Sequence, residues 1–287
     1  MKQRIDGKKG RASFLVLIIL SAIWLFPTVG LFVTSLRERT EAQRTGWWDV
    51  IFNPLSQDWD FGAYTTVLTE KNLGTSFISS MAVTIPATVL PLLFAAYAAF
   101  GFTFLKFRGR EFFFSIIIGL LVVPLQGALV PVLRMFISIT DKTGIEISGQ
   151  YAAAWFVHSA FAMPLAIYIL RNYMMTIPNT LIEAARMDGA SNFSIFWRLV
   201  LPISVPALAS FAIFQFLWVW NDYLIAFVFI GNERPVLTYT LLAMLGQYGE
   251  GWQAVAAGSF VSMSVPLLVF FTLQRYFVRG LTAGAVK

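Results

Sequence analysis

Six long apolar runs, separated by shorter polar segments, dominate the chain. The hydrocarbon core of a bilayer is about 30 Å thick and needs about 20 mostly apolar residues in a helix, a length that each run reaches. The runs cover residues 13–36, 73–105, 112–139, 151–170, 203–230 and 252–277. This pattern predicts an all-α, polytopic membrane protein with six transmembrane helices and with both termini on one side.

Composition supports the same class of protein. Of the 287 residues, 57% are hydrophobic and 13% are charged, and the mean hydropathy is +0.70. A soluble domain has a smaller apolar share and about twice the share of charged residues. The net charge of +6 could suggest nucleic acid as a partner, but the basic residues lie at the ends of apolar runs. Membrane topology explains them better, and we expect no nucleic-acid partner.

Basic residues predict the orientation, because Lys and Arg are retained in cytoplasmic segments. With both termini inside, the outer segments hold six of the 21 basic residues, namely Arg37, Arg39, Arg44, Lys71, Lys142 and Arg234. The first run is too long for a signal peptide and lacks an A-x-A cleavage site, so we expect it to be retained. We therefore predict a multi-pass protein of the cell membrane, organised as a cytoplasmic basic tail (1–12), a first transmembrane helix (13–36), an extracytoplasmic loop (37–72), a five-helix core (73–277) and a cytoplasmic tail (278–287).

The predicted outer loop carries Trp47, Trp48 and Trp59 among acidic residues. The amphipathic tryptophan ring prefers the headgroup level of a membrane, so contact with lipid is one interpretation. Contact with an external partner is the other. The chain shows no tandem repeat, low-complexity tract or flexible linker that would indicate a second domain.

No catalytic centre is expected in this chain. Without cysteine and with one histidine, it can form no disulfide, thiolate zinc site or multi-histidine metal site. The phosphate-binding pattern GxxxxGK followed by Ser or Thr is also absent. Any nucleotide chemistry therefore belongs to a partner, and we expect no metal, cofactor or catalytic residue here.

The polar interruption at residues 180–202 carries strong local signals. Thr180 precedes Glu183 by three residues, which is the capping-box pattern and predicts a helix that starts just after Thr180. About two turns later, Gly189 can adopt the left-handed conformation that ends a helix. Ser191 can then cap a second helix. We expect a helix, a sharp bend and a second helix at the cytoplasmic membrane surface.

Within the second predicted helix, helical spacing places four apolar residues on one face: Phe193, Phe196, Trp197 and Val200. Pro202 suits the first turn of the next membrane span. Glu183 has two interpretations. It only completes the capping box, or it also forms an ion pair with a basic group of a partner.

These residues carry a resemblance to a known family. Glu183-Ala184-Ala185, Asp188-Gly189-Ala190 and Leu201-Pro202 resemble the EAA loop in the permease subunits of bacterial ABC importers, with Leu199 where that pattern usually has Ile. Residues 164–168, 171–173, 177–178 and 220–223 resemble carbohydrate importers, and residues 280–287 are similar to the C-terminus of the maltose-type permease. Most of the chain thus resembles a binding-protein-dependent inner membrane component of the maltose/alpha-glucoside type.

The resemblance implies the fold of type I ABC importer permeases, in which a second homologous permease completes a heterodimeric path. It implies two ATP-binding cassette subunits, which hold ATP and Mg, and an extracytoplasmic sugar-binding protein. The EAA loop would contact an ATPase subunit through Glu183, Ala184, Ala185, Asp188, Gly189, Leu201 and Pro202. The tail residues Leu281, Thr282, Ala283, Gly284 and Lys287 would reach the ATPase dimer interface.

Polar residues inside the membrane are costly and are therefore candidates for the substrate path. They are Gln126, between two prolines, and the group Trp218, Trp220, Asn221, Asp222 and Tyr223. Amide, carboxylate and aromatic groups suit the hydroxyls and ring faces of sugars. The structural alternatives are a helix–helix hydrogen bond for Gln126 and a place at the outer interface for Asp222. His158 is expected to be a helix–helix contact.

The predicted function is therefore a permease subunit of an ATP-driven sugar importer. The resemblance is nearest to alpha-glucoside permeases, a group for maltose, trehalose, sucrose and glucosylglycerol, and it does not choose among these sugars. An ion-driven secondary carrier is an alternative, but it usually shows internal repeats and charged midplane residues. A polytopic membrane enzyme needs acids, histidine or a nucleophile clustered at one membrane face. Neither pattern is visible in the sequence.

Overall fold

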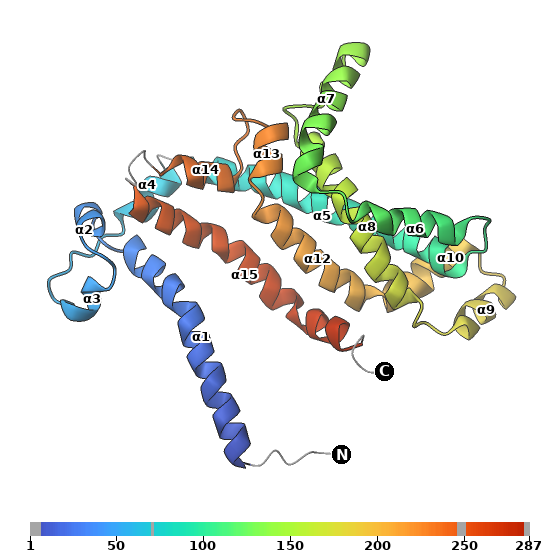
Figure 1. Cartoon of the computed structure of the whole chain (residues 1–287), viewed down its shortest axis with the longest axis horizontal. Helices are drawn as coiled ribbons and strands as arrows, with labels where there is room; N and C mark the ends of the chain where they lie inside the picture. Colours follow the sequence, from blue (N-terminus) through green and yellow to red (C-terminus); the bar gives the residue numbers. More distant parts are fainter. Residues whose placement is uncertain (1–6, 70–71, 246–250, 284–287) are drawn as a thin grey trace. The chain divides into compact units, whose positions relative to one another are not determined.

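The computed structural model describes residues 7–69, 72–245 and 251–283, and its regular elements within these ranges are helices (Figure 1). One isolated antiparallel bridge joins Arg37 and Trp59. The predicted all-α class is confirmed.

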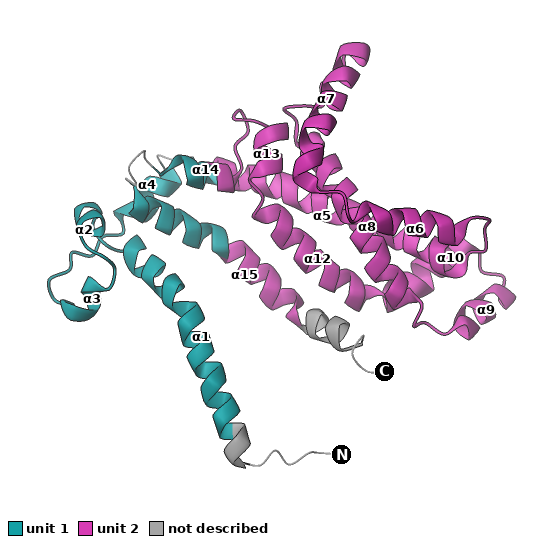
Figure 2. Cartoon of the chain, viewed as in Figure 1, with its two compact units in different colours: residues 1–74, 240–263 teal, residues 75–239, 264–287 magenta. Residues whose placement is uncertain are grey.

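The chain divides into two compact units, which Figure 2 colours separately. The first unit, residues 1–74 and 240–263, contains α1 (Gly7–Ser35), α2 (Arg39–Arg44), α3 (Asp49–Phe52) and α4 (Gly62–Thr69). The second unit, residues 75–239 and 264–287, contains α6 (Arg110–Leu120), α7 (Leu125–Thr143), α8 (Tyr151–Met174), α9 (Asn179–Met187), α10 (Asn192–Ile195), η1 (Phe196–Val200), α11 (Leu201–Ile203), α12 (Val205–Trp220) and α13 (Leu224–Phe229). The boundaries between the units fall within α5 (Leu73–Phe104), α14 (Leu237–Ala243) and α15 (Trp252–Ala283).

Four helices in the described part of the chain are long and apolar enough to cross a membrane: Arg11–Ser35, Leu73–Phe104, Tyr151–Met174 and Trp252–Gln274. Two bent pairs pass the same test together. The pair α6 and α7 is bent by 103°, and the helical stretch Asn192–Ile203 is bent by 72° against α12. Counting each bent pair as one span gives the six that the hydrophobic pattern predicts.

The third and fifth predicted spans are therefore not single helices. The third stops at Leu120 and resumes at Leu125, because Pro124 takes the N-cap position with extended backbone and has no N–H to donate. In the fifth span, α12 begins at Val205 and ends at Trp220, well before the predicted end of the run. A hydrophobicity pattern alone does not reveal such breaks, since the sequence stays apolar across them.

Two apolar clusters hold the second unit together. One joins the end of α5 to α8 and to the segment that follows it, with Phe100, Leu170 and Phe196 at its centre. The other joins α7, α8 and α13 and includes Val157 and Phe229. Several members of both clusters are alanines, whose small side chains let helix backbones approach closely.

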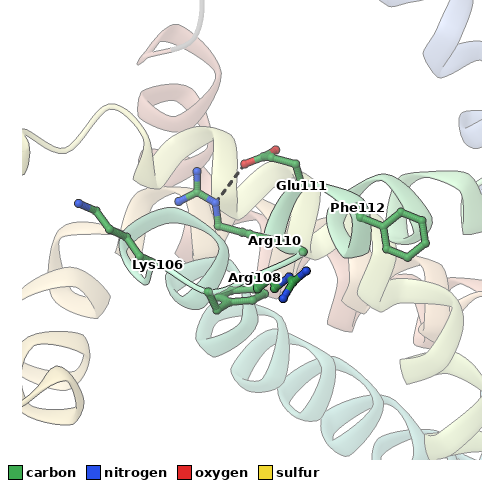
Figure 3. A pocket seen from close by; sticks show the side chains of 7 residues that line it. Lys106, Arg108, Arg110, Glu111 and Phe112 are labelled. Atoms are coloured by element: carbon green, nitrogen blue, oxygen red, sulfur yellow. Dashed lines mark hydrogen bonds and ion pairs between the residues drawn. The ribbon is translucent and has the colours of Figure 1, made fainter.

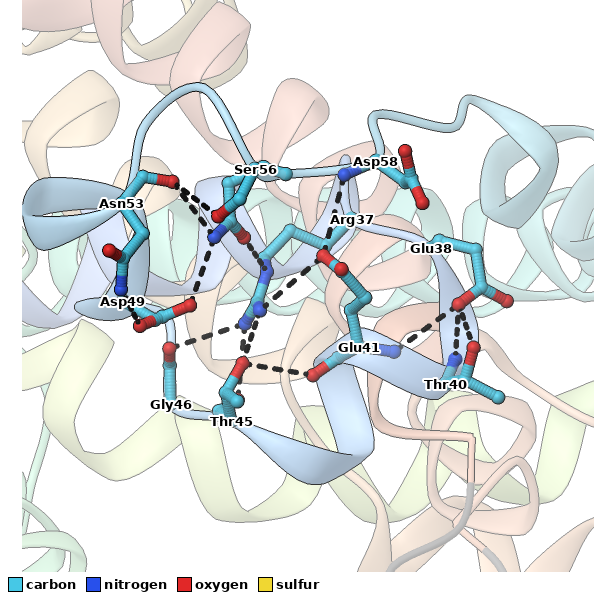
Figure 4. Close-up of polar contacts among 11 residues, drawn as sticks. Arg37, Glu38, Thr40, Glu41, Thr45, Gly46, Asp49, Asn53, Ser56 and Asp58 are labelled. Carbon is cyan, nitrogen blue, oxygen red and sulfur yellow. Dashed lines mark hydrogen bonds and ion pairs between the residues drawn. The ribbon is translucent and has the colours of Figure 1, made fainter.

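In the first unit, residues 36–62 form a compact segment around Arg37, which we call the Arg37 segment (Figure 4). Arg37 is 1% exposed, and its Nε donates to Gln57 Oε1 at 3.0 Å. Its Nη1 donates to the backbone oxygens of Thr45 at 3.1 Å and Gly46 at 3.2 Å. The guanidinium presents five N–H donors in a planar fork, so one side chain ties several parts of the segment together.

The tryptophans of this segment have different surroundings. Trp47 packs edge-to-face on Phe26 of α1, with the ring centroids 4.8 Å apart. The close approach depends on Gly30, because a Cβ there would lie 2.4 Å from the Trp47 ring. Trp48 and Trp59 are exposed. Contact with lipid and contact with a partner both stay predictions for these rings.

Candidate functional site

The connection between α8 and α12 is where the sequence predicts a functional surface. Its first helix, α9, starts at Asn179, earlier than the capping-box pattern predicts. Pro178 occupies the N-cap position with φ −59° and ψ 129°, and no side chain caps the helix. Thr180 consequently lies inside the first turn, where its hydroxyl cannot act as the N-cap. The predicted capping box is wrong, and Glu183 is left exposed without that structural task.

The predicted bend at Gly189 is confirmed. Its φ is +79°, which is the left-handed conformation. The Gly189 N–H donates to the Arg186 oxygen at 3.0 Å, and the Ala190 N–H donates to the Ala185 oxygen at 3.0 Å. These are the two bonds of a Schellman motif. A residue with a side chain is disfavoured in this conformation by about 1–2 kcal/mol, so glycine suits the position.

The second helix begins at Ser191, whose Oγ accepts the Ser194 N–H at 3.2 Å, and this cap is as predicted. The helix continues through α10, η1 and α11 before the 72° bend at Ser204 leads into α12. Pro202 lies in the first turn of α11, as expected, and α12 starts with Val205. The 72° bend separates the two helices within the bent pair that counts as the fifth span, so Pro202 precedes the bend and does not open α12 itself.

The predicted apolar stripe of the second helix is half right. Phe196 and Val200 are buried as expected, whereas Phe193 and Trp197 are exposed. The buried face follows Ile195, Phe196 and Val200 instead. The π-helical turn η1 departs from the 3.6-residue spacing over Phe196–Val200, but Phe193 lies before this turn, so the turn does not account for its exposure.

Helix α9 has an inward and an outward face. On the inward face, Ile182 is buried in the apolar cluster and Arg186 Nη2 donates to the Phe104 oxygen at 3.1 Å. The outward face exposes Leu181, Glu183, Ala184, Met187 and Asp188, and Met187 is 88% exposed. A helix that is fixed on one side and presents exposed apolar and acidic groups on the other is suited to receive a partner protein.

The predicted substrate-path residues come from two places. Gln126 is exposed in the first turn of α7. The other five occupy the end of α12 and the break after it, where Trp218 and Asn221 are exposed. Trp220 is 2% exposed, and its ring stacks on Phe216 with a centroid distance of 5.7 Å. Its side chain thus contributes to the core of the second unit.

Asp222 contacts the single histidine, a pairing that the sequence did not indicate because the two residues lie in different spans. Asp222 Oδ2 lies 3.7 Å from His158 Nε2, and it accepts the N–H groups of Ile225 at 2.9 Å and Ala226 at 3.1 Å. The His158 ring also packs edge-to-face on Trp218, at 5.4 Å between centroids. His158 is thus a helix–helix contact, as expected, and Asp222 caps α13 from within the protein.

Tyr223 belongs to an aromatic group that was not predicted from the sequence. Its ring centroid lies 5.4 Å from that of Phe227 and 6.2 Å from that of Tyr239, and the last two are 6.2 Å apart. The three planes are within 15° of parallel. Each ring adjoins both others, so the three form one aromatic cluster. The spacing of Tyr223 and Phe227 is a weak signal for it, and nothing in the sequence indicates Tyr239.

The predicted C-terminal contact lies at the edge of the described residues. Leu281, Thr282 and Ala283 form the end of α15, whereas Gly284 and Lys287 lie outside the described residues. Within the ranges that the structure describes, no group of three or more His, Cys, Asp or Glu side chains could hold a metal ion.

Residues 77–283 match a family model described as "Binding-protein-dependent transport system inner membrane component". The chain is 45% identical over 276 residues to the osmoprotective compounds uptake permease protein GgtD of Synechocystis, a match that covers 95% of this chain and 91% of the relative. It is 48% identical over 226 residues to the alpha-glucoside transport system permease protein AglG of Rhizobium meliloti, covering 78% of this chain and 59% of that permease.

Two solved structures share the fold. A chain of a bacterial ABC transporter involved in import of the acidic polysaccharide alginate has a TM-score of 0.74 at 24% identity, covering 96% of this chain and 99% of that chain. A bacterial alginate ABC transporter in complex with an alginate pentasaccharide-bound periplasmic protein has a TM-score of 0.57 at 17% identity, covering 94% and 96%.

Proposed function

Since this chain belongs to the family of binding-protein-dependent transport system inner membrane components, we propose that it is a permease subunit of an ATP-driven importer for alpha-glucosides and related oligosaccharides. It forms half of a heterodimeric path with a second, homologous permease. Two ATP-binding cassette subunits supply ATP hydrolysis with Mg, and an extracytoplasmic binding protein delivers the sugar. Both termini lie in the cytoplasm.

The observation that carries the proposal is the geometry of residues 179–203, which we call the coupling segment. Its inward face is fixed by buried Ile182 and Phe196, and its outward face offers exposed Glu183, Asp188 and Met187. An ATPase subunit would dock on this outward face. Ala184 lies on the same face and lets a partner backbone come close.

The helical order of the chain supplies the mechanism. The coupling segment ends with η1 and α11 at the 72° bend, which leads into α12. The far end of α12 and the break after it hold five of the six path candidates. A shift of the docked segment therefore moves α12 as a lever. ATP-driven closure of the partner needs only a differential affinity of a few kcal/mol between two states to shift their populations. Leu201 and Pro202 lie in α11, the last helix of the coupling segment before the bend, and so transmit the movement to α12.

The names of the relatives support the substrate class. One relative is an alpha-glucoside permease and another takes up osmoprotective compounds. For the path, we assign contact with the sugar to exposed Trp218, Asn221 and Gln126 and to the aromatic cluster of Tyr223, Phe227 and Tyr239. Aromatic rings suit the apolar face of a sugar ring, and amides suit its hydroxyls. Asp222 and Trp220 hold these groups in place.

The test is sugar-stimulated ATP hydrolysis by the complete importer with its binding protein in liposomes. We compare Glu183→Ala and Gly189→Ala with the wild type. Coupling free energies of about 1–3 kcal/mol correspond to about 5- to 150-fold effects, and we expect both variants to lose stimulated hydrolysis and uptake within this range. Maltose, trehalose, sucrose and glucosylglycerol are tested against a β-glucoside, which we expect not to stimulate.

The chain offers a matched control for each variant. Gly144 also ends a helix with positive φ (+72°). A Cβ added at Gly144 or at Gly189 would have nothing within 4 Å, so Gly144→Ala carries the same backbone cost elsewhere. Glu146→Ala removes an exposed carboxylate outside the coupling segment. Full stimulation in the Glu183 and Gly189 variants, in assembled complexes, would show that the coupling assignment is wrong.

A further inference from the structure

The connection from α5 to α6 is a cationic surface that the proposed function does not use. Residues 106–112, which we call the basic loop, line an open depression of about 680 Å³ (Figure 3). Three of the seven residues are the cations Lys106, Arg108 and Arg110, and one is the carboxylate Glu111.

The charges of this surface do not balance. Glu111 is shared by two arginines: Arg110 Nε donates to it at 3.0 Å, and Arg171 Nη2 donates to both of its oxygens at 3.1 Å. Lys106 and Arg108 are exposed and form no hydrogen bond or ion pair with the residues that the structure describes. Figure 3 accordingly shows a dashed contact from Arg110 and none from Lys106 or Arg108. The basic loop therefore carries uncompensated positive charge.

Exposed aromatic rings lie among these cations and just after them. Phe107, Phe112 and Phe113 are all exposed, and Phe112 is 66% exposed. The loop also joins two apolar helices, α5 and α6, so it lies where the chain leaves and re-enters the membrane. Rings that reach the acyl region beside cations at headgroup level are typical of a segment that rests on a membrane surface.

We propose that the basic loop binds the headgroup of an anionic phospholipid in the cytoplasmic leaflet. Lys106 and Arg108 contact the phosphate, and the acyl chains lie along Phe112 and Phe113. This inference rests on the proposed orientation with both termini inside. The position of these rings favours lipid over a soluble partner protein, because Phe112 and Phe113 are exposed at the start of α6, which is part of a candidate membrane span.

The bound lipid lies next to the coupling segment. Arg171, at the end of α8, holds Glu111 of the basic loop, and Arg186 of α9 donates to the oxygen of Phe104 at the end of α5. An anionic lipid on the basic loop therefore stabilises a surface that both ends of the α8–α9 connection contact.

The experiment titrates the purified, assembled importer in detergent with phosphatidylglycerol or phosphatidylcholine and counts bound lipids by native mass spectrometry. Each basic residue at an anionic surface contributes about fivefold in affinity. We therefore expect Lys106→Gln to lower the affinity for phosphatidylglycerol about fivefold, and K106Q/R108Q to lower it about 20- to 30-fold. Phosphatidylcholine binding stays unchanged. The matched control R39Q/R44Q removes two exposed cations of α2 and is expected to change the affinity less than twofold.

Three results would overturn the proposal. One is wild-type affinity for phosphatidylglycerol in K106Q/R108Q, or an equal loss in the control. A second is competition by glycerol phosphate at the concentration of the lipid, which would assign the site to a soluble phosphate. The third is loss of the ATPase subunits from K106Q/R108Q with unchanged lipid binding, which would assign the loop to protein docking. Because both faces are open in detergent, none of these results depends on the orientation of the chain.

Discussion

The coupling segment and the Arg37 segment are both short, bent helical connections, and they are held together in opposite ways. The coupling segment packs apolar side chains inward, with Ile182, Ile195 and Phe196 almost fully buried, and exposes charge. The Arg37 segment has a polar interior of Arg37 and Gln57 and exposes apolar residues, among them Leu55, which is fully exposed. Many apolar contacts therefore stabilise the coupling segment, whereas the hydrogen bonds of a single guanidinium stabilise the Arg37 segment.

The difference predicts how each segment fails. Packing is shared among many contacts, so the loss of one side chain leaves most of the others in place. A hydrogen-bond network centred on one buried donor group fails as a unit, because removing the donor leaves several acceptors unsatisfied.

The largest effect is therefore expected for Arg37→Met. The variant removes the donors to Gln57, Thr45 and Gly46 while keeping an apolar stem of similar length. We expect a loss of about 3–5 kcal/mol in the local stability of residues 36–62, because several acceptors lose their donor and each one left buried and unsatisfied costs about 1–3 kcal/mol. Amide hydrogen exchange of the assembled importer measures it.

Arg39→Met is the control, because Arg39 is exposed on α2 and the same substitution there removes no buried hydrogen-bond network. Similar exchange rates in the two variants would show that the guanidinium does not organise the segment. Arg37→Lys keeps the charge but loses the fork, and we expect it to fall between the wild type and Arg37→Met.

A smaller loss is expected for Ile182→Ala in the coupling segment. The substitution removes buried methyl groups from the inward face of α9 and should cost about 2–3 kcal/mol, the lower part of the range for such cavities, because the exposed segment can partly collapse. Faster exchange in residues 179–187 is the readout. Leu181→Ala, one residue away and exposed, is the matched control. Equal effects of the two would contradict the inward packing of α9.

The same contrast explains what the sequence could predict. Apolar periodicity and glycine placement are local signals, so the spans, the bend at Gly189 and the cap at Ser191 were accessible. The capping box failed because two local signals compete, and Pro178 fixes the helix start more strongly than Thr180 does. Half of the apolar stripe was misplaced because apolar residues at helical spacing do not indicate which edge of the stripe packs inward, and Ile195 continues the buried face on one side only.

Polar pairings over long sequence separations were not accessible. Arg37 looks like one of several loop arginines until the fold brings Gln57 to it. His158 and Asp222 each stand out as polar residues in apolar surroundings, but only the packing of α8 against the end of α12 brings them together. The functional roles proposed for the coupling segment came from the spacing of its motif, and the structure adds which of its faces is free.

The smallest effect is expected from acid. The Thr40 hydroxyl, followed by the backbone N–H groups of the α2 start, holds the pKa of Glu38 below its ordinary value of 4.5. Asn53 and then Gln57 hold the pKa of Asp49 below its ordinary value of 3.8.

A carboxyl group whose pKa is lowered by folding contributes stability above its unfolded pKa and loses it as pH falls through the folded pKa. The Arg37 segment should therefore loosen gradually below about pH 4.5, the point at which protons first favour unfolded Glu38. Both residues are only partly buried, so the change in hydrogen exchange is expected to be slight and to be reduced in Glu38→Gln. The apolar packing of the coupling segment does not titrate, so amide hydrogen exchange in residues 179–187 should not respond to acid in this way. A similar loosening of residues 179–187 over the same pH range would contradict the view that the two segments are held together by different forces.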